Sequence, residues 1–239
     1  MPTGDAVTEN DRLDPVSMPA ARILTDFIDS TMIRGVGWGS TIVSVSPYLV
    51  RKPVRNTQVI QLNGAGNAHT TGLVYASEII GRFGAAFGAT VQQFPVPAFF
   101  DDPATKEAFW RERSTARVLT VQRRMDVAVL GIGSPSADVP SHVYAGGYLD
   151  RANYDDPAYA NVVGDISTIF FRADGSHNDI PLNARSCGPG FTVLIRVPRR
   201  IAVVSGQAKL AALCGAVATG VITDLVVDEI TAGQLAAMD

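Results

Sequence analysis

The stretch DVAVLG, residues 126–131, is a continuous apolar run that begins at an aspartate and ends in glycine. Strands of a parallel sheet have this composition, because helices cover both faces of such a sheet and bury every side chain. Other short β-rich runs lie on both sides of it in the chain, and segments with helical spacing separate most of them. This alternation predicts an α/β fold with a mainly parallel sheet, helices on both faces, and residues 126–131 as a central strand.

The remaining elements follow the same alternation. Ala173-Asp174-Gly175 is a turn signal between two extended runs, which predicts a hairpin. Residues 134–157 are polar and rich in Gly, Pro and Asp, and we expect a loop with a short helix there. Residues 17–239 are predicted to form one domain that follows a polar tail, residues 1–16. We expect strands at 33–36, 58–62, 89–94, 200–204 and 224–227, hairpin arms at 163–172 and 176–182, and helices at 17–29, 40–49, 70–87, 102–112, 114–124, 208–218 and 231–237.

The composition excludes several classes of protein. Of the 239 residues, 46% are hydrophobic and 18% charged, which is enough apolar material for a large core and too little charge for a disordered chain. No apolar run approaches the length that a bilayer requires, and residues 1–11 are acidic and polar, unlike a signal peptide. We therefore expect a cytoplasmic protein without a membrane partner.

The cysteines, histidines and basic residues are equally sparse. Cys187 and Cys214 lie far apart in apolar or Gly-rich surroundings, which favours two free thiols. The three histidines have no Cys, His or carboxylate at ligand spacing, so we predict no metal site and no cofactor. The net charge is −3 and basic residues cluster only in pairs, so the chain alone is not expected to bind DNA. No nucleophile elbow or histidine motif is present, and we predict no catalytic residue.

The most distinctive local motif is GVGWGST, residues 35–41, between a predicted strand and a predicted helix. Glycines let the backbone bend tightly, and a helix start offers unpaired N–H groups that suit an oxyanion such as phosphate. Ser40 and Thr41 would add hydroxyl donors. A plain glycine turn into a helix has the same pattern, so the motif alone leaves both interpretations open. It lacks the lysine of a Walker loop and the spacing of a dinucleotide-binding loop.

Three further Gly/polar or Pro-rich loops also follow predicted strands, namely residues 63–67, 94–97 and 131–134. Ligands of open α/β sheets bind at the carboxyl ends of strands, so four such loops predict a binding cleft. Three isolated charges beside these patterns are candidate ligand residues. Asp165 could instead cap a turn, Arg185 could form a surface salt bridge, and Lys209 could be a solvated surface lysine.

Taken in order, these motifs resemble the sugar-binding domain of SorC-type bacterial transcriptional regulators. The resemblance implies a Rossmann-like domain related to the phosphosugar isomerases, such as ribose-5-phosphate isomerase and glucosamine-6-phosphate deaminase. It also implies a homo-oligomer, a dimer or tetramer, that reaches operator DNA only through an N-terminal helix-turn-helix module, which we expect to be absent from this chain. The segments that carry the resemblance are 36–41, 94–98, 127–133, 163–166, 170–175, 182–185, 201–209 and 225–232.

The resemblance implies that the domain binds a sugar or sugar phosphate as an effector without converting it. A true isomerase or deaminase on the same fold is the alternative, with Asp165 as base and Lys209 as the polarising cation. A third hypothesis is that the domain serves only as an oligomerisation scaffold, but a scaffold would not need four Gly/polar or Pro-rich loops at the ends of strands. We expect the phosphate at Gly37, Gly39, Ser40, Thr41 and Lys209, and the sugar at Asn63, Gly64, Asp165 and Arg185.

Overall fold

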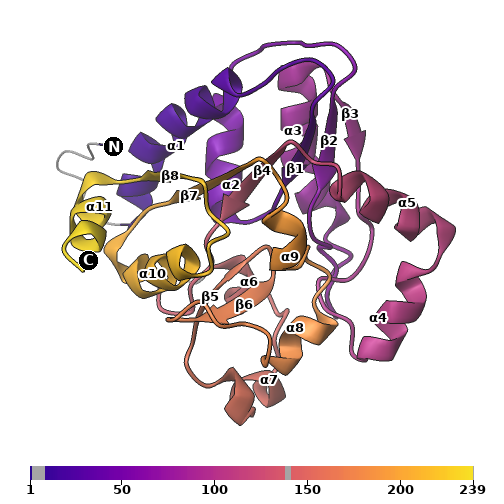
Figure 1. The fold of residues 1–239 in the computed structure, drawn as a ribbon, viewed down its shortest axis with the longest axis vertical. Helices are drawn as coiled ribbons and strands as arrows, with labels where there is room; N and C mark the ends of the chain where they lie inside the picture. Colours follow the sequence, from indigo (N-terminus) through magenta and orange to yellow (C-terminus); the bar gives the residue numbers. More distant parts are fainter. Residues whose placement is uncertain (2–8, 138–140, 239) are drawn as a thin grey trace.

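A six-stranded sheet forms the centre of the computed structural model, which describes residue 1, residues 9–137 and residues 141–238. Every pair of neighbouring strands in it is parallel, and the strand order is β3-β2-β1-β4-β7-β8 (Figure 1). The mainly parallel α/β fold is therefore confirmed, and β4 lies in the middle of the sheet as predicted. The strands are β1 (Ile33–Val36), β2 (Gln58–Gln61), β3 (Thr90–Gln92), β4 (Val127–Gly131), β7 (Arg199–Val204) and β8 (Asp224–Val227).

The core divides into two layers, one on each face of this sheet. Alternate residues of β4 point to opposite faces, so Val127 and Val129 join one apolar cluster while Ala128 and Leu130 join the other. The first cluster packs against α1 (Glu9–Asp26), α2 (Ser40–Val45) and α3 (Leu73–Phe87). The second packs against α5 (Arg113–Gln122), α9 (Phe191–Leu194) and α10 (Leu210–Ala218). Both faces are thus buried, which explains the uninterrupted apolar run of residues 127–131.

The first helix begins earlier than the sequence predicts. The predicted start is residue 17, but α1 begins at Glu9 and contains Pro15 and Pro19. Proline usually interrupts a helix, yet Val16, Ala20 and Leu24 are spaced by four residues and all are buried against the sheet. Tertiary packing therefore continues the helix through both prolines. Part of the predicted polar tail is thus helical, while residues 2–8 of that tail lie outside the described residues.

A hairpin forms in this region, but the predicted pairing of residues 163–172 with residues 176–182 is wrong. Strands β5 (Val162–Ile166) and β6 (Ile169–Arg172) pair antiparallel, and they are joined by Ser167 and Thr168 rather than by residues 173–175. Both turn residues have positive φ, 50° and 68°, which side chains disfavour, and the sequence therefore carries no turn signal there. The Ala-Asp-Gly signal instead ends β6, where Gly175 has a φ of 80°.

The segment after this turn is not the strand predicted at 176–182, because it leads into the helix α8 (Pro181–Arg185). The remaining elements are short and lie mostly outside the two layers. Figure 1 shows the hairpin, α6, α7 and α8 gathered beneath the sheet in this view. No helix in the described ranges is long and apolar enough to cross a membrane. The other helices are α4 (Pro103–Trp110), α6 (His142–Ala145), α7 (Arg151–Asp155) and α11 (Glu229–Ala236), with 3-10 turns η1 (Ser46–Tyr48), η2 (Pro157–Tyr159) and η3 (Gln207–Lys209).

Candidate ligand-binding site

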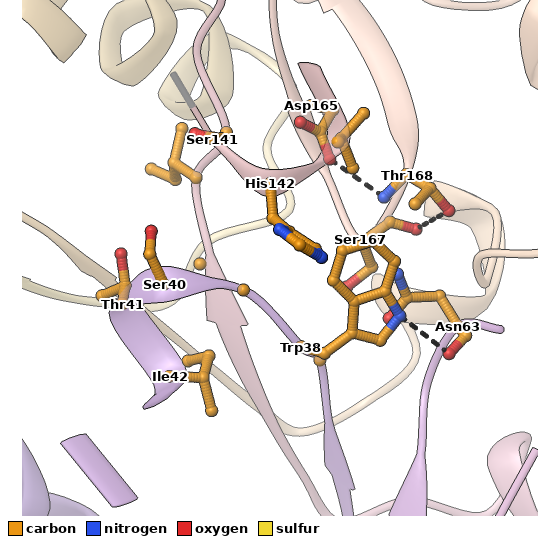
Figure 2. A pocket seen from close by; sticks show the side chains of 16 residues that line it. Trp38, Ser40, Thr41, Ile42, Asn63, Ser141, His142, Asp165, Ser167 and Thr168 are labelled. Carbon is orange, nitrogen blue, oxygen red and sulfur yellow. Dashed lines mark hydrogen bonds between the residues drawn. The ribbon is translucent and has the colours of Figure 1, made fainter. Parts of the chain in front are cut away.

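A pocket opens where the strand order of the sheet reverses. The chain leaves β1 toward β2 on one side and returns through β4 on the other, so the loops after β1 and β4 separate and leave a crevice. The β5–β6 hairpin closes this crevice, since Gly133 pairs with Asp165 in an isolated bridge. The space between the lining residues, together with the solvent at its open mouth, amounts to about 450 Å³. Its lining comes from residues 37–42, Asn63, residues 131–133, residues 141–143, Asp165, Ser167 and Thr168 (Figure 2).

The loop after β1 presents unpaired backbone donors to the pocket. Gly39 precedes α2 with φ 147° and ψ 166°, a conformation open almost only to glycine. The N–H of Val43 donates to Gly39 O at 3.0 Å and closes the first turn of α2. The N–H groups of Ser40, Thr41 and Ile42 precede that bond, and none of them donates a hydrogen bond to another described residue. This wall of the pocket therefore offers hydrogen-bond donors.

The opposite wall offers acceptors. The side-chain oxygens Asn63 Oδ1 and Asp165 Oδ1 are buried and accept no hydrogen bond from the described residues. A buried acceptor left without a donor costs about 1–3 kcal/mol, so a ligand that brings hydroxyl groups to these atoms would recover that energy. The two walls together suit a molecule with an anionic end and a hydroxyl-bearing end.

Asp165 combines two of the roles that the sequence left open. Its Oδ2 accepts the N–H of Thr168 at 3.0 Å and so caps the hairpin turn, while Oδ1 accepts no hydrogen bond from the described residues. Burial raises the pKa of this carboxyl to about 6, against the opposing effects of the Thr168 N–H, the Tyr144 hydroxyl and the Lys209 charge. Gly133 makes room for it, because a β-carbon there would lie 1.9 Å from Oδ1.

The structure brings six of the nine predicted ligand residues into this pocket: Gly37, Gly39, Ser40, Thr41, Asn63 and Asp165. Lys209 is buried at the start of α10, close enough to act on the charge of Asp165, but it does not line the pocket. The alternative of a solvated surface lysine is therefore wrong.

Gly64 and Arg185 lie away from the pocket. The N–H of Gly64 donates to Cys187 Sγ at 2.8 Å, and a β-carbon at position 64 would lie 2.2 Å from Val96 O. Gly64 therefore packs in the wall behind the site. Arg185, at the end of α8, borders a separate hollow that also includes Asp102 and Asp150. The loop at residues 94–97 is likewise absent from the lining, and Pro95 and Pro97 border a neighbouring hollow.

Sequence reasoning missed several lining residues. Trp38 lies inside the recognised glycine motif, and its indole Nε1 donates to Gly64 O at 2.8 Å. Ser167 and Thr168 lie two and three residues after Asp165, but they belong to a turn that the sequence placed elsewhere. His142 lies in the polar segment 134–157, where no pattern distinguishes it. Within the described ranges, no group of three His, Cys, Asp or Glu side chains is placed to hold a metal ion.

Comparison with known proteins gives one consistent result. A family model described as "Putative sugar-binding domain" matches residues 3–237. The deoxyribonucleoside regulator of Bacillus subtilis strain 168 is 27% identical over 222 residues, which cover 92% of this chain and 69% of that protein.

Solved structures agree with the sequence matches. A domain of a "possible sugar-binding transcriptional regulator" from Arthrobacter aurescens TC1 is 51% identical, with a TM-score of 0.91 over 98% of this chain and 90% of the other. The full-length sorbitol operon regulator SorC from Klebsiella pneumoniae has a TM-score of 0.85 at 21% identity, over 96% of this chain and 74% of the other. At 21% identity, the similarity to SorC shows a shared fold.

Proposed function

Because this chain belongs to the sugar-binding domain family of SorC-type transcriptional regulators, we propose that the pocket between β1 and β4 binds its effector, a sugar or sugar phosphate. The observation that carries the proposal is the pairing of unsatisfied groups across one pocket. Unpaired N–H groups begin α2 on one side, and the unpaired oxygens of Asn63 and Asp165 lie on the other. A sugar phosphate is the simplest molecule that satisfies both sets of groups, since its phosphate accepts from the N–H groups and its hydroxyls donate to the oxygens.

The anionic end of the effector lies at the loop after β1. Gly37 and Gly39 shape the backbone there, and the N–H groups and hydroxyls of Ser40 and Thr41 supply donors. Lys209 acts through its charge, which lowers the pKa of Asp165 against the effect of burial. The hydroxyl-bearing end lies against Asn63 and Asp165.

The domain acts as a sensor and does not convert its effector. An isomerase would need a carboxylate base and a cation that both reach the substrate. Asp165 and Lys209 are near each other, but Lys209 does not line the pocket, and one Asp165 oxygen is occupied by the Thr168 N–H. The absence of Lys209 from the pocket lining supports a sensor over an isomerase.

We infer the oligomeric state, the location in the cell and the DNA contact of the protein from the family. The chain works as a cytoplasmic homo-oligomer, a dimer or tetramer, and operator DNA is contacted through a helix-turn-helix module rather than through this domain. A net charge of −3 supports the second point, because phosphate contacts require clustered basic side chains.

Calorimetry with inorganic phosphate, free sugars and their phosphate esters tests the proposal. We expect at least one ester to bind more tightly than both its free sugar and inorganic phosphate, because it occupies both walls. Incubation of the bound ester with the protein should leave it unchanged when analysed by NMR. Absence of binding across the panel at millimolar concentration would refute the proposed site, and turnover of any ester would refute the sensor role.

A further inference from the structure

His142 projects into the pocket, although no predicted ligand group includes it. It is the first residue of α6 and follows Ser141, whose Oγ accepts the N–H of Ser134 at 3.0 Å. That bond ties the start of α6 to the loop after β4. In the view of Figure 2, the imidazole lies between Ser40 and Trp38, with Asn63 beyond the indole.

Three aromatic rings hold this imidazole in place. Its centroid lies 4.8 Å from that of Tyr75, 5.4 Å from that of Tyr148 and 5.7 Å from that of Trp38. Trp38 is itself fixed, since it stacks on Tyr148 with a centroid distance of 5.1 Å and donates to Gly64 O. The ring is therefore positioned before a ligand arrives, as recognition of a small molecule requires.

The imidazole is suited to a neutral polar contact. The side chain is half-buried, and this burial lowers the pKa of His142 from its ordinary value. A neutral imidazole carries one N–H donor and one acceptor nitrogen. No hydrogen bond between described residues engages either nitrogen, although the ring faces are packed.

We propose that His142 binds the effector directly and selects among sugars by the configuration of one hydroxyl group. This inference rests on the proposed function of the pocket. Asn63 Oδ1 can only accept hydrogen bonds, as can Asp165 Oδ1 when that carboxyl is ionised, while the backbone N–H groups at the start of α2 can only donate them. His142 can do both, so it matches a hydroxyl that accepts one bond and donates another. An epimer with that hydroxyl on the other face of the sugar loses the contact.

A purely structural role for the imidazole makes a different prediction. If His142 only completes the aromatic cluster, phenylalanine at this position preserves its function, because the ring contacts remain. If the nitrogens bind the effector, His142→Phe removes a hydrogen bond and keeps the packing. His177 gives a matched control, since its ring packs on Phe191 at 4.6 Å between centroids and does not line the pocket.

Calorimetry with inorganic phosphate and epimeric sugar phosphates decides between the two roles. For His142→Phe we expect a loss of about three- to tenfold in affinity for the tightest sugar phosphate, a reduced preference between epimers, and unchanged binding of inorganic phosphate. His177→Phe should bind all probes as the parent does. Equal affinities in His142→Phe and the parent, or an equal loss for inorganic phosphate, would overturn the proposal.

The same measurements distinguish failure of the proposed function from failure of the inference about His142. If the parent protein binds no probe, the proposed function fails together with this inference. If the parent binds and His142→Phe keeps the parent's order of epimers, only the inference fails. Should His142→Phe not fold, His142→Gln replaces it. Glutamine keeps a donor and an acceptor at a different reach, so the order of epimers should change, and an unchanged order would overturn the proposal.

Discussion

The loop after β1 and the turn of the β5–β6 hairpin both line the pocket, but they obtain their shapes by opposite means. Gly39 adopts φ 147° with open space where a side chain would be, so the absence of a side chain gives the loop its shape without strain. Ser167 and Thr168 adopt left-handed conformations despite their side chains. Hydrogen bonds compensate there, since Thr168 donates its N–H to Asp165 and pairs its hydroxyl with Ser186 at 2.9 Å.

The difference separates two kinds of function within one site. The loop presents backbone groups, which side-chain substitutions leave in place. The hairpin presents a carboxylate whose position and charge depend on neighbours that are distant in sequence. Substitutions should therefore affect the hairpin wall more than the loop wall, except at the glycine that gives the loop its shape.

The largest effect should be a pH dependence of stability that comes from Asp165. Burial raises its pKa from 3.8 to about 6, so the folded protein binds this proton more tightly than the unfolded chain does. The resulting stabilisation is complete below the ordinary pKa and is lost as the pH rises through about 6. It amounts to roughly 3 kcal/mol, at 1.36 kcal/mol for each pKa unit. Urea unfolding of the parent and of Asp165→Asn between pH 4 and 7.5 should give curves that converge at low pH and differ at high pH. Parallel curves would contradict the assignment.

Asp165→Asn should also weaken effector binding. The amide must still accept the Thr168 N–H, so its NH₂ group replaces the free Oδ1 and can no longer accept from a ligand hydroxyl. Loss of a hydrogen bond to a charged group corresponds to about 1.5–3 kcal/mol, or roughly ten- to a hundredfold in affinity. Calorimetry with the tightest sugar phosphate measures it. Arg185→Ala is the control, since Arg185 borders a different hollow and its removal should change affinity less than about twofold.

Gly39→Ala tests how far the conformation of this glycine determines stability and phosphate binding at the loop after β1. A methyl group meets nothing within 4 Å, but the backbone conformation is strained for alanine, at about 1–3 kcal/mol. We expect a lower free energy of unfolding and weaker binding of inorganic phosphate, both measurable on one preparation. Unchanged phosphate binding would show that the shape of the loop is not set by this glycine.

Thr168→Val tests the hairpin by an isosteric change. Valine keeps the branched shape but removes the buried hydroxyl that donates to Ser167 O and pairs with Ser186 Oγ. The free energy of unfolding should fall by about 1–2 kcal/mol in denaturant titrations. No change would mean that the strained turn is held by the Asp165–Thr168 bond alone.

The smallest effect should come from Thr41→Ala. The hydroxyl is lost, yet the N–H groups of residues 40–42 remain at the start of α2. Affinity for the sugar phosphate should fall by no more than about threefold, which corresponds to well under 1 kcal/mol. A loss larger than that of Asp165→Asn would reverse the comparison between the two walls.

Sequence periodicity alone was enough to predict the sheet, the central position of residues 127–131 and most helices. These features depend on residues within a few positions of one another, such as the apolar run of β4 or the spacing of Ile79, Ile80 and Phe83 in α3. The glycine loop was predictable for the same reason, because its backbone shape is encoded in Gly37 and Gly39 themselves. The ordered motifs also carried the resemblance to the SorC-type domain.

Only the tertiary structure decided which loops meet. The reversal of strand order between β1 and β4 brings Asp165, Ser167 and His142 to the glycine loop, and it leaves Arg185 and Gly64 outside. The left-handed turn at Ser167 and Thr168 depends on bonds to Asp165 and Ser186, and α1 passes through two prolines because the sheet buries its apolar face. Contacts between residues that are far apart in the chain leave no local pattern, because their energy is gained only once the strands have been ordered in space.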